Sequence, residues 1–383
     1  MTRSSGSLGG LSAPALARLG APVPAVESAS AANLLAWATA RGKLRSGMAD
    51  VARIAFVGDS KTVGAGAGSG TQATIGAFAR SRPARVAALL AVAGLPVRTD
   101  AFFGTAGLGT MPDVLAYDPR RSGFTGWTGG VASLGGGAMS TGNGNPGSFQ
   151  PGGPVDRCSV FFRNGSDRPV FTVAKGAETV TVTPSGAVNT FVRQEVSFAA
   201  RDAGPIVITR TGTASNLHFV GLVAWDNARP GVEIANFGVY GVTSAYQADM
   251  GSPGAPVAAL ASYAPHLTII NLGTNDVAQG VMQATWLANL RTIIGQARAS
   301  GSVILCWPAI GGAAPVGGAD AVRAHWRNGA RALAQETGCL FIDEEALLGG
   351  RAAAQASGAL PDGLHEAAWA YDIQAGAIAR AIL

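Results

Sequence analysis

The chain has 383 residues, of which 48% are hydrophobic and 13% charged, so it is long enough for two or three packed domains and is not a disordered protein. The net charge of +5 does not indicate a nucleic-acid partner, because the basic residues are scattered and lysine occurs only at positions 43, 61 and 175. No apolar run reaches the roughly 18 residues of a membrane span, and the first thirty residues lack the apolar segment of a Sec signal peptide. We therefore expect a soluble chain, either cytoplasmic or exported by another route; its oligomeric state is not indicated.

The N-terminal region, residues 1–50, predicts a leader and one helix. Residues 1–27 are rich in Ala, Gly, Ser and Pro and are expected to form a flexible leader. The pattern over 28–48 is typical of an amphipathic helix with Ser28 as its N-cap. Trp37 is expected to anchor this helix on the main domain.

Residues 51–106 are expected to form the first part of an α/β domain. An apolar strand at 51–57 breaks into Gly-Asp-Ser and a glycine-rich stretch at 64–70, and a helix is expected at 75–93. Strand, turn and helix in this order open a βαβ unit.

Residues 107–231 have a different character and predict an inserted β domain. A stretch rich in Gly, Pro, Ser and Thr is followed by short β-branched or alternating runs every eight to twelve residues, which is typical of a β-sandwich or jelly roll. Most aromatic side chains here are expected in its core. Trp127, in a glycine-rich loop, is the candidate for stacking on a sugar ring if the insert binds carbohydrate.

Residues 232–383 return to alternating strands and helices. Strands are expected at 232–235, 267–272, 303–307 and 339–342, and helices at 257–263, 284–299, 319–337 and 366–383. The simplest architecture is therefore a parallel α/β domain interrupted by the β insert. Three cysteines are too few for a disulfide scaffold, and a bridge between Cys306 and Cys339 would require their strands to be neighbours.

Ser60, in the Gly-Asp-Ser turn, is the candidate nucleophile. A serine hydroxyl needs a base that accepts its proton during attack. Of the four histidines, His365 is the best candidate, because Asp362 precedes it by three residues on a Pro-Asp-Gly turn and can reach Nδ1. The other three, at positions 218, 266 and 325, are expected to be structural.

An oxyanion hole would need donors aimed at the carbonyl oxygen of the substrate. Asn275 follows the strand at 267–272 and offers a side-chain N–H, and the Ser60 amide is a second donor. A third could come from the turn Gly104-Thr-Ala-Gly107 or from the stretch at 236–243. Asp276 beside Asn275 is expected to serve in a turn rather than as a second acid.

These stretches together resemble the ordered blocks of the SGNH (GDSL-type) hydrolase superfamily. The matching sequences are Phe56-Val-Gly-Asp-Ser-Lys-Thr-Val-Gly64, the Asn-x-Gly-x-x-Gly-x-Thr pattern at 236–243, Gly273-Thr-Asn-Asp276 and Asp362-Gly-Leu-His365. The resemblance implies Ser60 as nucleophile, His365 as base and Asp362 as its orienting carboxylate, with an oxyanion hole of Ser60, Gly241 and Asn275. It also implies a three-layer α/β/α, flavodoxin-like fold with a five-stranded parallel sheet.

The chain departs from the family pattern in three respects. The insert separates the first two blocks, Lys61 stands beside the nucleophile, and Glu366-Ala-Ala follows the histidine where many members have Pro and Asn. We expect the two local changes to alter the rim of the pocket.

The sequence thus predicts a serine esterase that works through an acyl-enzyme, without metal or cofactor, on an ester such as an acetylated polysaccharide. Two alternatives stay open: an O-acyltransferase that uses the same triad, and a non-catalytic carbohydrate-binding adhesin. The run Gly142-Asn-Gly-Asn-Pro-Gly147 satisfies a dinucleotide-binding spacing, but it contains Pro and the sequence predicts neither a strand before it nor a helix after it, so a dinucleotide site is not expected.

Overall fold

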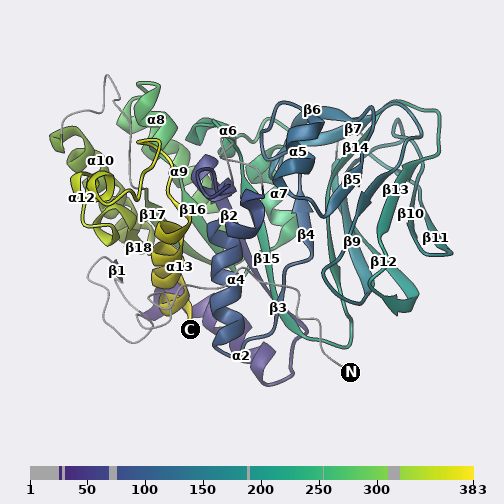
Figure 1. Cartoon of the computed structure of the whole chain (residues 1–383), viewed down its shortest axis with the longest axis horizontal. Helices are drawn as coiled ribbons and strands as arrows, with labels where there is room; N and C mark the ends of the chain where they lie inside the picture. The colour runs from purple at the N-terminus through teal and green to yellow at the C-terminus, as the bar shows by residue number, and fades with distance from the viewer. Residues whose placement is uncertain (1–25, 28–30, 69–75, 188–189, 253, 309–319) are drawn as a thin grey trace.

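The central element is a mixed sheet of seven strands in the order β1-β18-β17-β16-β2-β15-β3 (Figure 1). The computed structural model describes residues 26–27, 31–68, 76–187, 190–252, 254–308 and 320–383, so most of the expected leader and Ser28 lie outside it. The strands of this sheet are β1 (Val26–Glu27), β2 (Val51–Gly58), β3 (Val97–Arg98), β15 (Gly231–Gly238), β16 (Leu267–Asn271), β17 (Ser302–Trp307) and β18 (Leu340–Asp343). All neighbouring strands run parallel except β1, which pairs antiparallel with β18.

Helices cover both faces of this sheet. The helices of the described residues are η2 (Ala31–Leu34), α2 (Leu35–Arg45), α3 (Ser60–Val63), η3 (Ala77–Arg80), α4 (Arg82–Val92), α5 (Met111–Tyr117), α6 (Ser244–Gln247), α7 (Pro256–Tyr263), α8 (Thr274–Ala278), α9 (Gln283–Arg298), α10 (Asp320–Thr337), α11 (Glu344–Leu347), α12 (Arg351–Ala356) and α13 (Ala368–Ile382). The side chains of α2, α4 and α13 share one core with one face of the sheet, and those of α7, α9 and α10 share another core with the opposite face. The predicted three-layer α/β class is confirmed, and two short edge strands, β1 and β3, extend the expected five strands to seven.

The second part is a β domain of two antiparallel sheets, seen on one side of the molecule in Figure 1. Their strand orders are β11-β10-β13-β8-β5 and β12-β9-β14-β7-β6, with β4 also paired to β14. The strands are β4 (Ala101–Phe103), β5 (Arg121–Gly123), β6 (Thr128–Ser133), β7 (Gly136–Thr141), β8 (Gly147–Phe149), β9 (Val155–Asn164), β10 (Phe171–Lys175), β11 (Glu178–Val182), β12 (Thr190–Asp202), β13 (Ile206–Arg210) and β14 (Leu217–Trp225). Side chains of both sheets meet in one aromatic-rich core, as the alternating pattern of the sequence predicts.

The β domain packs closely on the α/β domain. Phe103 of β4 and Phe161 of β9 belong to the same core as β15 and α7, with the Phe103 ring 4.7 Å from that of Phe237. Strand β4 precedes the boundary expected at residue 107, yet it pairs with β14. β4 therefore belongs to the β domain by its pairing, and the two parts share a core and are not joined by linkers alone.

Trp127 is buried in the β domain, so the interpretation that its ring stacks on a sugar is wrong. Its side chain is only 3% exposed, its Nε1 donates to the carbonyl of Asn145 at 2.9 Å, and its ring packs edge-on against Phe124. The glycine-rich loop folds inward because the indole can bury its apolar body while its N–H keeps a partner.

Two further expectations concern the helix at 75–93 and the cysteines. The helix expected at 75–93 is divided into η3 and α4, because Ser81 is extended and Pro83 lies in the first turn of α4. The three cysteines are free and buried, although the strands of Cys306 and Cys339 are neighbours, since Cys306 lies opposite Ile342. In the part of the chain that is described, we find no helix with the length and apolar character that crossing a membrane requires.

Candidate active site

Three strand ends bring the predicted site residues to one edge of the sheet. Gly58 of β2 is in register with Gly238 of β15 on one side and with Asn271 of β16 on the other. Ser60, Gly241 and Asn275 each follow one of these positions by two to four residues. The carboxyl ends of adjacent parallel strands are where α/β domains place their sites, so the register itself gathers these residues.

Ser60 is held in a tight turn between β2 and α3. A Cβ atom on Gly58 would lie 2.0 Å from Thr62 Oγ1 and 2.6 Å from the carbonyl oxygen of Asn271, so only glycine fits there. The Asp59 carboxylate accepts from the amide of Lys61 at 2.9 Å and caps the short helix that Ser60 begins. The Ser60 side chain is therefore fixed at the sheet edge and is only 4% exposed.

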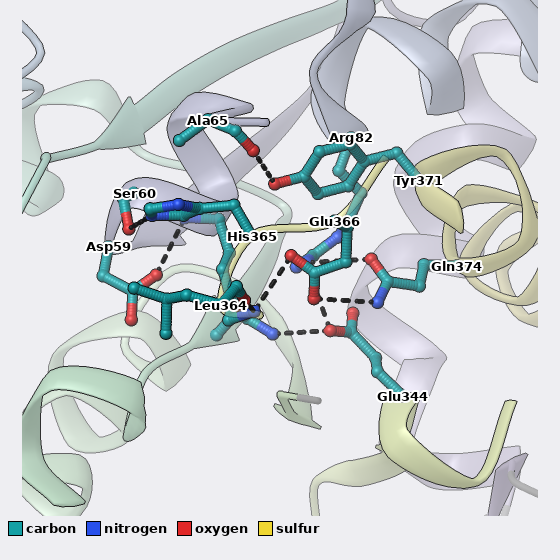
Figure 2. Close-up of polar contacts among 12 residues, drawn as sticks. Asp59, Ser60, Ala65, Arg82, Glu344, Leu364, His365, Glu366, Tyr371 and Gln374 are labelled. Carbon is teal, nitrogen blue, oxygen red and sulfur yellow. Dashed lines mark hydrogen bonds and ion pairs between the residues drawn. The ribbon is translucent and has the colours of Figure 1, made fainter. Parts of the chain in front are cut away.

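Ser60, His365 and Asp362 form one hydrogen-bonded chain. Nε2 of His365 lies 3.0 Å from Oγ of Ser60, and Nδ1 lies 2.7 Å from Oδ2 of Asp362. Figure 2 shows the imidazole directed at the hydroxyl. The tautomer that this arrangement requires carries its proton on Nδ1, which leaves Nε2 free to accept the proton of Ser60.

The Asp362 carboxylate also organises the turn that carries His365. Its Oδ1 accepts from the amides of Leu364 at 2.9 Å and His365 at 2.6 Å. Burial acts to raise the pKa of Asp362, but the hydrogen bonds from His365 and Leu364 outweigh it and hold the pKa below its ordinary value. Asp362 is thus ionised where it faces His365, and the 46% exposure of its side chain also favours the charged form.

Asn275 lies beside the loop that contains Gly241. Its Nδ2 donates to the carbonyl of Val242 at 2.8 Å, which leaves the second amide hydrogen for another acceptor. Gly241 has a φ of +75°, the left-handed region that favours glycine. The alternative turn at Gly107 lies against the same loop, where Ala106 accepts the amide hydrogen of Tyr240 at 2.8 Å.

Asp276 links the segment that carries Asn275 to Ser244, which follows the Gly241 loop, and its hydrogen bonds do not involve Ser60. It is buried and accepts from the hydroxyl of Ser244 at 2.6 Å and from the Ser244 amide at 3.0 and 3.1 Å. Burial raises its pKa, and the Ser244 hydrogen bonds act in the opposite direction. The expected structural role of Asp276 agrees with these contacts.

The expectation that Lys61 and Glu366 alter the pocket rim is wrong. Both side chains are 0% exposed, and Lys61 Nζ lies 3.0 Å from Glu366 Oε2 beneath the site. The sequence could not reveal the pairing, because only the fold brings positions 61 and 366 together.

Tyr240 is the residue of this region that sequence reasoning missed. Its ring stacks on the imidazole of His365 with centroids 5.9 Å apart, and the residue is 40% exposed. Its position between the two glycines of the second block, Gly238 and Gly241, was the available signal.

The three other histidines have structural surroundings. His218 is in β14, where burial lowers its pKa to about 4, and Nδ1 of His266 accepts from the amide of Arg53 at 2.9 Å. His325 lies on α10, where its carbonyl accepts from Gln283. None of these contacts involves Ser60.

The α/β/α fold and the Ser-His-Asp chain at its sheet edge define a serine hydrolase of the SGNH class. Residues 206–373, which are less than half of the chain, match the model of the GDSL-like Lipase/Acylhydrolase family, so this part of the chain is similar to that family. Together with the Ser60–His365–Asp362 arrangement, the match supports a serine carboxylic-ester hydrolase. The match begins within β13 of the β domain, and Ser60 lies outside it. No curated protein sequence matches the chain.

Solved structures extend the comparison to the β domain. A peptidoglycan O-acetylesterase is 17% identical, covers 93% of this chain and 97% of its own, and superposes with a TM-score of 0.68, which shows a common fold. An acetylxylan esterase from Geobacillus stearothermophilus is 20% identical, covers 40% of this chain and 73% of its own, and has a TM-score of 0.33.

Proposed function

We propose that the protein is an O-acetylesterase that removes short acyl groups, acetyl above all, from a carbohydrate. The observation that carries this proposal is the hydrogen-bonded chain in which His365 lies 3.0 Å from the Ser60 hydroxyl and 2.7 Å from the Asp362 carboxylate. A hydroxyl, an imidazole and a carboxylate in this order are the components of acyl transfer through a serine ester.

In the first half of the reaction Ser60 Oγ attacks the ester carbonyl. His365 Nε2 takes the hydroxyl proton, and the negative charge of Asp362 stabilises the imidazolium. The tetrahedral intermediate then collapses, the bond to the alcohol oxygen breaks, and His365 returns the proton to that oxygen. The sugar leaves as a free alcohol, and the acetyl group stays on Ser60.

In the second half a water molecule attacks the acyl-enzyme. His365 takes a proton from this water, the bond between the acyl carbon and Ser60 Oγ breaks, and His365 gives the proton to Ser60 Oγ. The product is acetic acid, which leaves as acetate after losing its proton to solvent. Negative charge develops on the carbonyl oxygen in both halves, and the amides of Ser60 and Gly241 with Asn275 Nδ2 are the donors we assign to it. The hydrogen bond from Asn275 to Val242 supports this assignment, because it fixes the orientation of the carboxamide.

The substrate class has separate support. The relative whose fold matches over 93% of this chain, β domain included, is a peptidoglycan O-acetylesterase. The exposed ring of Tyr240 beside His365 offers a flat apolar surface of the kind on which sugar rings pack. We propose that the β insert helps to position a polymeric sugar at the site, through residues other than Trp127.

The test compares wild type with Ser60→Ala on p-nitrophenyl esters from acetate to palmitate and on acetylated polysaccharides. We expect hydrolysis of the acetate ester to fall by roughly four orders of magnitude or more in the variant, as when a nucleophile is removed from a triad. Ser357→Ala is the matched control, because this serine is exposed at the end of α12 and is expected to leave the rate unchanged.

Two outcomes would contradict the proposal. Hydrolysis that survives in Ser60→Ala would remove Ser60 as nucleophile, and a preference of wild type for palmitate would remove the acetyl-carbohydrate assignment while leaving the triad intact. Free acetate in the products distinguishes hydrolysis from transfer of the acetyl group to a second sugar.

A further inference from the structure

A buried ion pair joins the two chain segments that carry Ser60 and His365. Lys61 directly follows Ser60, Glu366 directly follows His365, and Lys61 Nζ lies 3.0 Å from Glu366 Oε2 with both side chains 0% exposed. The same ammonium group donates to the carbonyl of Leu364 at 2.6 Å, on the other side of His365. Lys61 thus holds the backbone that flanks the base on both sides.

The Glu366 end of the pair is anchored to the core of the α/β domain (Figure 2). Glu366 Oε1 accepts from Gln374 of α13 at 3.3 Å, and Gln374 accepts from Arg82 of α4 at 3.1 Å. Arg82 in turn pairs with Glu344, which accepts from Asn271 at the end of β16. Burial acts to raise the pKa of Glu366, but the charges of Lys61 and Arg82 outweigh it and hold the pKa below its ordinary value, so the carboxylate is ionised.

The Lys61 end is equally fixed. Its amide donates to Asp59, and its helix leads into a turn that packs on the His365 segment. At Gly66 a Cβ atom would lie 2.6 Å from the Glu366 carbonyl oxygen and 2.8 Å from His365 Cβ. The two segments are therefore in direct contact above the ion pair.

The loop that carries His365 is partly exposed on its outer side. Asp362 is 46% exposed, and Gly363 has a φ of +76° in the turn that follows it. A buried ion pair is a poor source of stability compared with apolar packing of the same volume, since both charges lose their hydration. Lys61 and Glu366 each lie one residue from a member of the Ser60–His365 pair. We therefore infer that the ion pair positions Ser60 and His365 rather than stabilising the fold.

We propose that Lys61 and Glu366 are positioning residues that set the hydrogen bond between Ser60 and His365 and contact no substrate. This inference rests on the proposed function, because it assigns a role in the reaction of Ser60. A misplacement of about 1 Å at a reacting group can lower a rate on the order of a hundredfold, so a small shift of either segment is enough.

The test uses Lys61→Met, Glu366→Gln and the double variant, with p-nitrophenyl acetate as substrate and the folded fraction measured by circular dichroism. We expect each single variant to lower kcat by about tenfold to a hundredfold per folded molecule, with KM changed less than about threefold. The double variant is expected to lose less than the product of the two single effects, because no unpaired charge stays buried beneath the site.

Lys175→Met is the matched control. Lys175 is also 0% exposed, with Nζ 2.8 Å from Asp202, but it lies on β10 of the β domain. We expect this variant to melt at a lower temperature with unchanged kcat. If the Lys61–Glu366 pair only stabilises the fold, Lys61→Met and Glu366→Gln will also melt at a lower temperature with unchanged kcat. That result would overturn the proposal.

A second measurement, the labelling rate of Ser60, tests the positioning role even if the proposed function is wrong. The rate at which a fluorophosphonate labels Ser60 depends on the Ser60–His365 pair and not on the natural substrate. We expect labelling to slow by about tenfold to a hundredfold in both single variants, even if wild type proves inactive on acetate esters. Labelling at the wild-type rate in Glu366→Gln, which keeps the shape of the side chain, would overturn the proposal even if Lys61→Met does not fold.

Discussion

The phenol ring of Tyr240 covers one face of the His365 imidazole, with the ring planes inclined by 29° and the centroids 5.9 Å apart. The base is 5% exposed, whereas Tyr240 is 40% exposed. Tyr240 therefore separates the imidazole from solvent and presents its own outer face to whatever approaches. A substrate large enough to reach past the ester group will contact Tyr240 first.

We expect Tyr240→Ala to discriminate between large and small substrates. The loss of a stacking surface should raise KM for an acetylated saccharide by roughly three- to tenfold, since aromatic contacts contribute about 0.5–1.5 kcal/mol. KM for p-nitrophenyl acetate should change less, and Tyr240→Phe should behave as wild type on both. Equal effects of Tyr240→Ala on the two substrates would instead indicate that the ring only supports His365.

Asp362→Asn is expected to lower kcat by about three to four orders of magnitude. The asparagine keeps the size of the side chain but favours the wrong tautomer of His365 and removes the charge that stabilises the imidazolium. Steady-state hydrolysis of p-nitrophenyl acetate measures the effect. Because Asp362 also accepts from the amides of Leu364 and His365, thermal melting should accompany the assay to show that the turn stays folded.

Asn275→Ala tests the oxyanion assignment. Removal of one donor should lower kcat about 10²- to 10³-fold with little change in KM, because the hydrogen bond forms only as charge develops on the carbonyl oxygen. The variant also loses the hydrogen bond to Val242, so the folded fraction must be measured beside the rate. A rise in KM at constant kcat would assign Asn275 to substrate binding.

Asp59 predicts a pH dependence of stability. Burial raises its pKa to about 7, against the opposing effects of the Lys61 amide and of the charges on Lys61 and Arg82, while the negative charge of Glu366 adds to the rise. Between the unfolded value near 3.8 and about 7, the folded state binds more protons than the unfolded state. The contribution of Asp59 to the free energy of unfolding therefore falls as pH rises through this window.

The comparison of wild type with Asp59→Asn isolates that contribution, because asparagine can still cap α3 but does not titrate. We expect the variant to gain stability relative to wild type between about pH 4 and pH 7, on the order of 3 kcal/mol at most. Urea unfolding at a series of pH values measures it. A difference between the two proteins that stays constant with pH would show that Asp59 does not titrate in this range.

The sequence predicted the components of the site because each is encoded locally. Gly58-Asp-Ser60 closes a tight turn after a strand, and Asp362 reaches His365 within one short turn, so the spacing alone fixes their relation. The roles of Gly241 and Asn275 in an oxyanion hole stay predictions. The pairing of Lys61 with Glu366 could not be predicted from the sequence. The two residues are far apart in the chain and meet only after β2 and α13 pack in one core.

Most strands and helices could be predicted from the sequence, because apolar and polar residues alternate in the β segments and apolar runs recur in the α/β segments. The edge strands β1 and β3 were missed, because two residues carry no periodic signal. The division at Ser81 was readable from the Arg82-Pro83 pair that follows it, but the burial of Trp127 was not. Its indole N–H meets Asn145 only in the folded loop, and a glycine-rich sequence gives no sign of which way the ring turns.

The 305 positions between Ser60 and His365 have a consequence for biosynthesis. At roughly 5–20 residues per second the ribosome delivers His365 about 15 to 60 s after Ser60, with the whole β domain in between. For that time the nascent chain carries a serine without its base, and until residues 231–238 are made β2 also lacks both of its sheet neighbours, β15 and β16. The growing polypeptide therefore cannot hydrolyse an ester until its own synthesis has passed the histidine.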